Sequence, residues 1–382
     1  MDVALQLTLA DPAQFQPLPL GPRHYVPALQ TKKGELQALR VAPPTVWTRC
    51  TPLVEILGPR TPGNTPFSRA RVEGWVKRVA DAVGGHPIFL DRLRLAPNHV
   101  AESRHGRQPV LAAIYASATR RGLVFVPVSH LGEGPVTTER IAVAAAETGR
   151  GAALRVPLLG TVVPDGERLP TMVERAVAAL DVGIRGVDLL MDLRQIPEDA
   201  ELDIADLGSL IEELLKVGPW RNVVLLGTTM PRSLGGGVVE AGTTGRLPRK
   251  EWELWRELAQ AKLGRPLTFG DYAIQHPEPP LEVKDGQIPL GLRGAIRYTH
   301  TSATVIPRAK APRYEEGREQ YRHLCQLLVQ QPEFAGRDYT WGDQQIADCA
   351  EGRCHPGWED HWRGAATSHH LRVVVDQIAS LS

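Results

Sequence analysis

The stretch from residue 123 to residue 193 decides the fold. It reads LVFVPV at Leu123–Val128, LRVPLL at Leu154–Leu159 and VDLLMDL at Val187–Leu193, with helix-like sequence in between. The same alternation extends in both directions, and the full set of apolar or β-branched runs is Leu53–Leu57, Ile88–Leu90, Leu123–Val128, Leu154–Leu158, Val187–Leu193, Val223–Leu226, Leu267–Phe269 and Ala295–Tyr298. The runs begin roughly 28 to 45 residues apart, which is the length of one strand, one helix and two loops. Such units predict parallel strands that close into a (β/α)8 barrel.

The length of the chain predicts additions to this barrel. The 382 residues exceed the roughly 250 of a plain TIM barrel. We expect an N-terminal arm at residues 1–20, a (β/α)8 TIM-barrel-like domain at residues 21–331 and a C-terminal helical addition at residues 332–382. In this scheme Ala295–Tyr298 is the eighth strand, Glu315–Gln330 is the eighth barrel helix, and Tyr25–Pro27 is a short extended segment ahead of the barrel.

Net charge, the length of apolar runs and the cysteine content exclude several classes of protein. The 44 basic and 43 acidic residues give a formal net charge of +1, so no global field attracts the chain to nucleic acid or to anionic membrane. No apolar run approaches the roughly 18 residues of a transmembrane helix. The four cysteines, Cys50, Cys325, Cys349 and Cys354, form no dense disulfide framework, which favours a reducing cytoplasm. Cys349, Cys354 and His355 lack the spacing of a standard zinc site, so we expect no metal and can name no cofactor.

Polar residues stand at or just past the predicted strands, where this fold gathers binding and catalytic groups. They are Glu55, Asp91, His130, Asp192, Thr228, Asp271 and Tyr298. The carboxylates among them, Glu55, Asp91, Asp192 and Asp271, could share protons, hold a metal or bind hydroxyl groups at a barrel mouth. The alternative is a set of ordinary salt bridges to nearby arginines, including Arg92, Arg155 and Arg194. Because adjacent strand residues face opposite ways, a slip of one residue would rearrange the site.

A second candidate site is TSHH at residues 367–370. Thr367 or Ser368 is a suitable N-cap, so we expect a terminal helix whose first turn carries His369 and His370. The positive end of the helix dipole would keep both imidazoles neutral, and the free N–H groups there bind anions. Arg363, just upstream, could complete a clamp for a phosphate or a carboxylate. The alternative is a capped helix with two partly buried histidines.

Two further segments are candidates. Lys33 and Glu35 lie at the start of a predicted helix that ends near Val41, and a solvated helix start is the plainer alternative. The loop Thr228–Arg246 contains three consecutive glycines and few apolar anchors. This composition favours a flexible lid, with a simple surface loop as the alternative.

Six motifs resemble the phage "beta protein" family, which occurs in phage satellites and prokaryotic defence islands. They are YVPALQTKKGELQAL (25–39), PLVEI (52–56), FGDYAIQHP (269–277), GAIRYT (294–299), YTWGDQQI (339–346) and WRGAATSHHLRVVVDQI (362–378). The resemblance implies a role in phage defence or in a toxin–antitoxin-like module, with a protein partner encoded nearby, and it brings no established reaction. The positions that match the family pattern are Lys33, Glu35, Glu55, Asp271, Arg297, Tyr298, Gly342, Asp343, Arg363, His369 and His370.

Three functions are open at this point. The leading hypothesis is a cytoplasmic antiphage defence protein whose barrel mouth binds an anionic ligand, such as a nucleotide or a nucleic-acid end, and which acts with a protein partner. Any catalysis would then come from Glu55, Asp91, Asp192 and Asp271, and the ligand-binding residues would be Lys33, Glu35, Arg297, Tyr298, Asp343, Arg363, His369 and His370. The alternatives are a non-catalytic antitoxin-like or scaffold module that neutralises a toxic partner, and a hydrolase of glycosidase or phosphodiesterase type that uses the strand-end carboxylates. Barrels host many chemistries, so the fold alone selects none of them.

Overall fold

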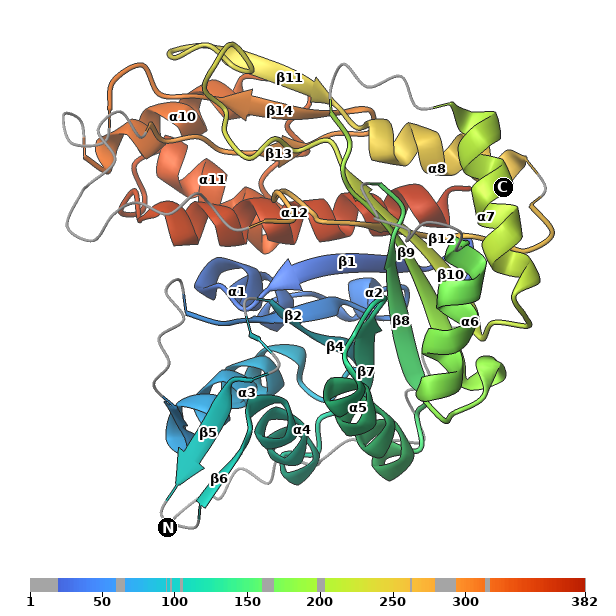
Figure 1. The fold of residues 1–382 in the computed structure, drawn as a ribbon. Helices are drawn as coiled ribbons and strands as arrows, with labels where there is room; N and C mark the ends of the chain where they lie inside the picture. Colours follow the sequence, from blue (N-terminus) through green and yellow to red (C-terminus); the bar gives the residue numbers. More distant parts are fainter. Residues whose placement is uncertain are drawn as a thin grey trace.

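A computed structural model describes the protein as a closed barrel of eight parallel strands with additional layers on one side (Figure 1). The described residues are 20–59, 66–93, 95–96, 98–103, 106–159, 168–197, 203–261, 263–278, 293–312 and 317–381. The N-terminal arm predicted at residues 1–20 therefore lies outside them, except for its last residue.

The barrel confirms the predicted fold class. Its strands along the chain are β1 (Tyr25–Gln30), β2 (Leu53–Leu57), β4 (Ile88–Leu93), β7 (Phe125–His130), β8 (Ala152–Pro157), β9 (Val187–Gln195), β10 (Asn222–Thr228) and β12 (Thr268–Asp271). Around the barrel they follow the order β1-β12-β10-β9-β8-β7-β4-β2, and every neighbouring pair is parallel. The first seven predicted runs all overlap barrel strands.

The prediction of the eighth barrel strand is wrong. The barrel is completed by β1, at the segment expected to precede it. Ala295–Tyr298 leads instead into an antiparallel sheet of β11 (Thr244–Pro248), β14 (Ala303–Pro307) and β13 (Tyr298–Thr299). Within this sheet β13 and β14 pair as an antiparallel hairpin. β1 escapes the sequence pattern because it is short and contains Pro27, a residue that usually argues against a central strand.

Helices fill the gaps between the strands, largely as predicted. They are α1 (Lys33–Arg40), α2 (Pro44–Trp47), α3 (Arg69–Val83), α4 (Val110–Arg120), α5 (Pro135–Thr148), α6 (Leu169–Ala179), α7 (Ile204–Lys216) and α8 (Lys250–Gln260), with a 3-10 turn, η2 (Ile184–Gly186), before β9. In α3 the Ser68 hydroxyl accepts a hydrogen bond from the backbone N–H of Arg71, and Gly84 ends the helix with φ 57°. A small sheet of β3 (Phe67–Ser68), β5 (Val100–Ser103) and β6 (Gly106–Pro109) lies beside α3 and α4.

The helix that covers β1 is the last one in the chain, not Glu315–Gln330. The C-terminal helices are α10 (Glu319–Val329), α11 (Trp341–Ala350) and α12 (Glu359–Ala379). α10 packs against α11 and β14, away from the barrel, whereas α12 lies between β1 and the β11–β14–β13 sheet (Figure 1). The predicted C-terminal helical addition is present, and α12 joins the barrel wall to the outer sheet.

Two glycines allow the close contacts of α12 with its neighbours. A Cβ atom on Gly34 of α1 would lie 2.3 Å from the carbonyl oxygen of Asp360, and one on Gly342 of α11 would lie 1.9 Å from that of Ala365. Both distances are far below van der Waals contact, so any side chain would force the helices apart. The close approach holds the start of α1 against α12.

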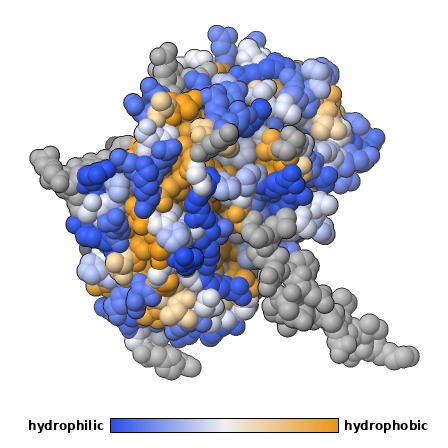
Figure 2. Space-filling view, turned by 90° about the vertical axis from the view of Figure 1, so that its right-hand side faces the viewer, coloured by the Kyte–Doolittle hydropathy of each residue, from blue (hydrophilic) through white to orange (hydrophobic). Residues whose placement is uncertain are grey.

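Apolar side chains form layers on both sides of the barrel wall. The barrel interior holds Val26, Ala28, Leu53, Phe89, Val128, Ala153, Leu190, Val224, Leu226 and Tyr272. A larger core lies between the strands and the helices outside them. On the face shown in Figure 2, hydrophilic residues predominate and hydrophobic ones appear in strips between them. None of the described helices combines the length and the apolar character needed to cross a membrane.

Candidate functional site

A ring of polar side chains lies above the apolar interior, toward the carboxyl ends of the strands. On each strand the polar residue follows an interior apolar residue by two positions, so both point into the barrel. The pairs are Leu53 and Glu55, Phe89 and Asp91, Val128 and His130, Ala153 and Arg155, and Leu190 and Asp192. The structure thus brings together Glu55, Asp91 and Asp192, three of the four carboxylates that the sequence nominated.

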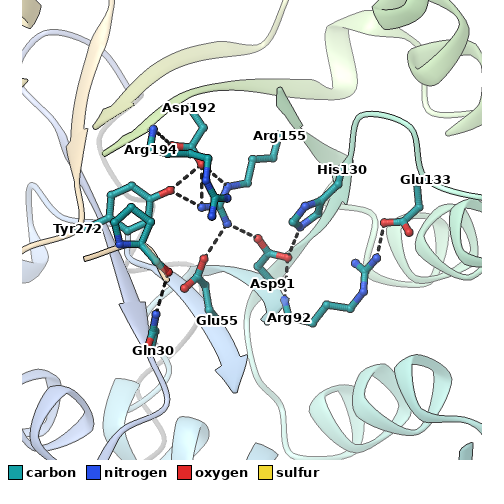
Figure 3. Close-up of polar contacts among 11 residues, drawn as sticks. Gln30, Glu55, Asp91, Arg92, His130, Glu133, Arg155, Asp192, Arg194 and Tyr272 are labelled. Carbon is teal, nitrogen blue, oxygen red and sulfur yellow. Dashed lines mark hydrogen bonds and ion pairs between the residues drawn. The ribbon is translucent and has the colours of Figure 1, made fainter. Parts of the chain in front are cut away.

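Arg155 occupies the centre of this polar ring (Figure 3). Its guanidinium donates to Glu55 Oε1 at 2.7 Å, to Asp91 Oδ2 at 2.8 Å and to Asp192 Oδ2 at 2.9 Å. It also donates to the Tyr272 hydroxyl at 2.6 Å, and that hydroxyl donates to Asp192 at 2.6 Å. Although burial alone would lower the pKa of Arg155, the neighbouring hydroxyl and carboxylates raise it well above its usual value. Three buried carboxylates therefore depend on one guanidinium, and sequence reasoning considered Arg155 only as a salt-bridge alternative.

Glu55 and Asp91 share Arg155 but differ in their other partners. Asp91 Oδ1 accepts from the backbone N–H of Arg92 at 2.7 Å and lies 2.7 Å from His130 Nε2. Burial opposes ionisation of Asp91, yet the imidazole and the two guanidinium groups beside it lower its pKa below the usual range. For Glu55, burial outweighs the pairing and raises the pKa, and its Oε2 has no hydrogen-bond partner within the described residues. Adjacent carboxyl groups with opposite pKa shifts are a typical basis for acid–base chemistry.

His130 is the most accessible member of the ring. Its side chain is 36% exposed, whereas the side chain of Arg155 is only 5% exposed. The strand order places Asp91 between Glu55 on β2 and His130 on β7, and Figure 3 shows these two side chains on opposite sides of the Asp91 carboxylate. The sequence identified His130 as a strand-end residue, but its pairing with Asp91, 39 residues earlier, is a tertiary contact that no local pattern reveals.

Asp271 faces away from the barrel interior, contrary to the prediction. It follows Phe269 by two residues, and Phe269 packs outward against Trp252 and Trp255 of α8, so both side chains of β12 point the same way. The alternation of strand residues explains the error, because the prediction assumed the opposite register. Asp271 therefore contributes nothing to the polar ring at the mouth.

The partners of Asp271 are buried side chains between the barrel wall and α12. Its Oδ1 accepts from the Tyr25 hydroxyl at 2.5 Å, and its Oδ2 lies 3.0 Å from His370 Nε2. The other ring nitrogen of His370 lies 2.7 Å from Thr299 Oγ1. Burial opposes ionisation of Asp271, but His370 and the other partners lower its pKa overall. We call Asp271, Tyr25, His370 and Thr299 the outer network; it ties β12, β1, α12 and β13 together.

His369 makes a neighbouring set of contacts to the outer layer. Its Nδ1 lies 3.0 Å from Asp343 Oδ2, and its Nε2 lies 2.8 Å from the carbonyl oxygen of Thr299. Its ring stacks on Tyr298 with 3.7 Å between centroids, and the Tyr298 hydroxyl donates to Asp343 Oδ1 at 2.6 Å. These side chains are buried, and each imidazole nitrogen has a protein partner. The polar groups of these side chains are therefore already paired within the protein. This argues against the ligand-binding roles predicted for Tyr298, Asp343, His369 and His370.

Thr367 and Ser368 do not cap a helix, which corrects the interpretation of TSHH. α12 begins at Glu359, with Trp358 in the N-cap position. His369 and His370 thus lie in the middle of a 21-residue helix, where the dipole has no local effect and where backbone N–H groups bond within the helix. The two histidines are fully rather than partly buried.

A second polar cluster lies where α1, α12 and the segment before β13 meet. Lys32, Arg297 and Arg363 are close enough to one another to lower the pKa of Lys32 and Arg297, although burial is the larger cause for both. Lys32 also interacts with Glu55, which connects this cluster to the barrel mouth. Sequence reasoning nominated Arg297 and Arg363 but chose Lys33, which is exposed, in place of Lys32.

Glu35 completes this cluster, which we call the cation cluster. It is buried, so the alternative of a solvated helix start is wrong. Burial raises its pKa even though Lys32 and Arg363 oppose this change. Among the described residues, no group meets hydrogen-bond geometry with either Glu35 oxygen, although the backbone of Gln30 and of Lys32 is near enough to oppose the rise in the pKa of Glu35. The Nε atoms of Arg297 and Arg363 have no partner within the same residues.

The loop after β10 and the cysteines have less support as functional sites. Met230, Leu234 and Val239 pack with β11 and β14, so the loop after β10 has the apolar anchors that its composition seemed to lack. All four cysteines are free thiols. Across the described ranges, no group of three His, Cys, Asp or Glu side chains is arranged to hold a metal ion.

These features define a (β/α)8-barrel protein with a charged ring at its mouth and a terminal helix that joins the barrel to an outer layer. Residues 25–376 match the family model described as Beta protein, so the chain belongs to that family. No curated protein matches the chain.

Several solved structures are similar at low identity. A mutant tryptophan synthase alpha-subunit from Pyrococcus furiosus has 13% identity and a TM-score of 0.37, over 66% of this chain and 89% of that one. Triosephosphate isomerase from Bartonella henselae has 11% identity and a TM-score of 0.33, over 65% and 91%. The carboxyl transferase domain of Rhizobium etli pyruvate carboxylase has 10% identity and a TM-score of 0.35, over 67% and 43%. The closed strand order of the barrel, rather than these scores, defines the fold.

Proposed function

We propose that this protein is a cytoplasmic component of antiphage defence whose barrel mouth binds an anionic ligand, such as a nucleotide, and which acts with a protein partner. The defence context and the partner are what the resemblance to this family implies, and the four free thiols fit a reducing compartment. The ligand rests on one observation, the cation cluster beside the mouth, in which Lys32 and Arg363 act on the buried carboxylate of Glu35 and Arg297 lies close to both of these cations.

The unpaired atoms of the cation cluster support a ligand. Glu35 has two, Arg297 and Arg363 have one Nε each, and Glu55 at the adjoining mouth has one, counting only partners among the described residues. A buried polar atom without a partner costs about 1–3 kcal/mol, and native proteins leave few of them. Their concentration in one place is explained if a bound molecule supplies the missing partners.

The two kinds of unpaired group specify the class of ligand. The ammonium of Lys32 and the guanidinium groups of Arg297 and Arg363 suit a phosphate or a carboxylate. The oxygens of Glu35 and Glu55 need donors, such as hydroxyl or amino groups. A nucleotide carries both, with its phosphates and its ribose hydroxyls. The formal net charge of +1 favours such a small ligand over a long nucleic acid, which a protein binds through an extended basic surface.

Calorimetric titration of the full chain with ADP at low salt tests the ligand, with adenosine and inorganic phosphate as the two fragments. We expect ADP to bind, and Arg297→Met to weaken binding at least about tenfold, because a charge-assisted hydrogen bond is lost. Arg185→Met is the matched control, since Arg185 is exposed beside the amino-terminal end of β9. Equal affinity in wild type and Arg297→Met, or no binding of any of the three probes, contradicts the proposal.

Phage challenge of cells that carry the chain with its neighbouring genes tests the defence context. We expect protection to fall in Arg297→Met and to persist in Arg185→Met. If Arg297→Met protects fully and still captures the same protein partner, the non-catalytic scaffold function replaces ligand binding as the explanation.

A further inference from the structure

We propose that the barrel mouth hydrolyses phosphate esters, with His130 as the general base and Glu55 as the general acid. This inference rests on the proposed function, because the ligand bound beside the mouth would be the substrate. It assigns a catalytic role to His130 and a specific role to Glu55.

His130 has the geometry of an oriented base. Its Nε2 lies 2.7 Å from Asp91 Oδ1, and Asp91 is itself fixed by the Arg155 guanidinium at 2.8 Å and by a backbone N–H at 2.7 Å. A carboxylate that is held in this way fixes both the tautomer and the direction of the imidazole. The other nitrogen, Nδ1, has no partner among the described side chains, and the ring is 36% exposed. His130 therefore presents a free nitrogen to a molecule in the mouth.

Glu55 is suited to donate a proton. Its Oε1 accepts from Arg155 at 2.7 Å, which fixes the carboxyl group, while its buried Oε2 has no partner in the part of the chain that the structure describes. Burial raises its pKa above that of an ordinary glutamate, so the group keeps its proton at higher pH. Glu55 and His130 lie on opposite sides of the Asp91 carboxylate (Figure 3), so the acid and the base belong to the same polar ring.

The position of the cation cluster indicates that the bond to be hydrolysed is a phosphate ester. Lys32 interacts with both Glu55 and the cations Arg297 and Arg363. A phosphate held by these cations would place its ester bond beside Glu55, and the positive charges would stabilise the charge that develops during hydrolysis. Arg363 already pairs with Asp360 at 2.6 Å and with Glu359 at 2.8 Å, so the charge available to a phosphate comes chiefly from Lys32 and Arg297. An uncharged glycoside would gain nothing from these two cations, so a phosphate ester fits this mouth better than a sugar.

The step needs only water as co-reactant. The water oxygen attacks phosphorus and forms a new P–O bond while the bond from phosphorus to the leaving alcohol oxygen breaks. His130 Nδ1 takes the proton that the water loses, and the Glu55 carboxyl gives its proton to the leaving oxygen. The imidazolium then returns a proton to the Glu55 carboxylate through solvent, so both groups are restored and no atom changes oxidation state.

Hydrolysis of bis(p-nitrophenyl) phosphate by the full chain, measured in EDTA to silence contaminating metalloenzymes, tests the inference. We expect measurable release of p-nitrophenol, and a fall of about 100-fold to 10,000-fold in His130→Gln, the range of general acid–base catalysis. His86→Gln is the matched control, because His86 is a partly exposed histidine at the amino-terminal end of β4. We expect its rate to stay within twofold of wild type.

The pH dependence separates an acid from a structural residue. Glu55 is faced by Arg155, Asp91, Asp192, Tyr272 and Lys32, and its variant Glu55→Gln cannot donate a carboxyl proton. Wild type should lose activity as the pH rises through the Glu55 pKa, and Glu55→Gln should be slow throughout and lack this decline. If Glu55→Gln fails to fold, rescue of His130→Gly by added imidazole decides instead, with no rescue counting against the inference.

Two results overturn the inference. One is no hydrolysis by wild type, and the other is an equal rate in His130→Gln. If ADP still binds in either case, the proposed ligand site stands and only the chemistry fails. If ADP, adenosine and phosphate all fail to bind while hydrolysis depends on His130, the ligand assignment fails and the catalytic pair stands.

Discussion

Asp192 and Asp271 have the same local structure and opposite surroundings. Each lies near the end of a barrel strand and accepts a hydrogen bond from the backbone N–H two residues later, at 2.7 Å for Arg194 and 2.8 Å for Ala273. Both of those following residues have positive φ angles, 55° and 50°. Asp192 nevertheless points into the barrel and Asp271 points out of it. The chemistry available to each aspartate is therefore set by which face of its strand it occupies.

The two networks around these aspartates differ in how completely they are paired. In the outer network, both oxygens of Asp271, the hydroxyl of Tyr25 and both nitrogens of His370 have partners. At the mouth, Glu55 Oε2 lacks a partner among the described residues, and His130 is partly exposed. Complete pairing of buried groups holds the fold together, whereas incomplete pairing leaves capacity to bind or to exchange protons. Three substitutions test this contrast.

Arg155→Met should have the largest effect on stability. It leaves Asp91 and Asp192 buried without their common counterion and Glu55 without its hydrogen-bond donor, and breaking one side of a buried pair typically costs about 3–5 kcal/mol. Urea unfolding followed by circular dichroism measures this loss. Arg120→Met is the control, because Arg120 is exposed and pairs with Glu73 at the surface. A loss below about 1 kcal/mol would mean that the three carboxylates do not depend on Arg155.

Asp271→Asn should cost less, about 1.5–3 kcal/mol, because it removes charge-assisted hydrogen bonds but keeps an oxygen acceptor. The pKa of Asp271 is lowered in the folded state, so its contribution is present above the ordinary pKa of about 3.9 and is lost as the pH falls through the folded value. Asp271→Asn should therefore lose less stability than wild type when the pH falls below about 3.9.

The control for Asp271 separates structure from function. Asp81→Asn removes an exposed carboxylate that pairs with Lys77, and its stability should stay close to wild type. ADP binding per mole of folded Asp271→Asn should equal that of wild type, since the outer network lies away from the mouth. A selective loss of binding in a folded Asp271→Asn protein would place Asp271 in the functional site after all.

The barrel could be predicted from sequence because its signal is local and repeated. Each run from Leu53–Leu57 to Leu267–Phe269 is an apolar strand, and helix-like sequence fills most of the gaps between them. β1 lacks that context. The prediction of the closing helix is wrong because two strands of the outer sheet, β13 and β14, and two helices come between β12 and α12, whereas the nearest helix in sequence is the natural candidate. Where extra strands and helices are inserted between a barrel strand and the helix that covers it, sequence order does not identify that helix.

The site could be predicted from sequence only in part, because strand alternation does not say which face of a strand is inside. Glu55, Asp91, Asp192 and Asp271 all follow an apolar residue by two positions, and only the packing of Phe269 against α8 shows that Asp271 lies on the outer face. Arg155 gives no local signal, because the carboxylates that hold it lie 37 to 100 residues away along the chain. Its position depends on a charge balance that only the closed barrel creates.

Glu35→Gln should have the smallest effect on stability, and in the opposite direction. The pKa of Glu35 is raised in the folded state, so its contribution is fully present below the ordinary pKa of about 4.3 and is lost as the pH rises through the folded value. At neutral pH the buried carboxylate of Glu35 destabilises the folded state, whereas an uncharged amide does not. We expect Glu35→Gln to gain about 0.5–2 kcal/mol in urea unfolding at pH 7 and to bind ADP at least about tenfold more weakly.

A gain in stability with a loss of binding is the result that a purely structural Glu35 would not produce. If Glu35 capped α1 and did nothing else, its removal would cost stability and leave ADP binding intact, which is the outcome that contradicts the prediction. Glu253→Gln changes an exposed glutamate in the first turn of α8 and should alter neither quantity. Lys33→Gln should also leave binding unchanged, because Lys33 is exposed and it is the neighbouring, partly buried Lys32 that acts on Glu35.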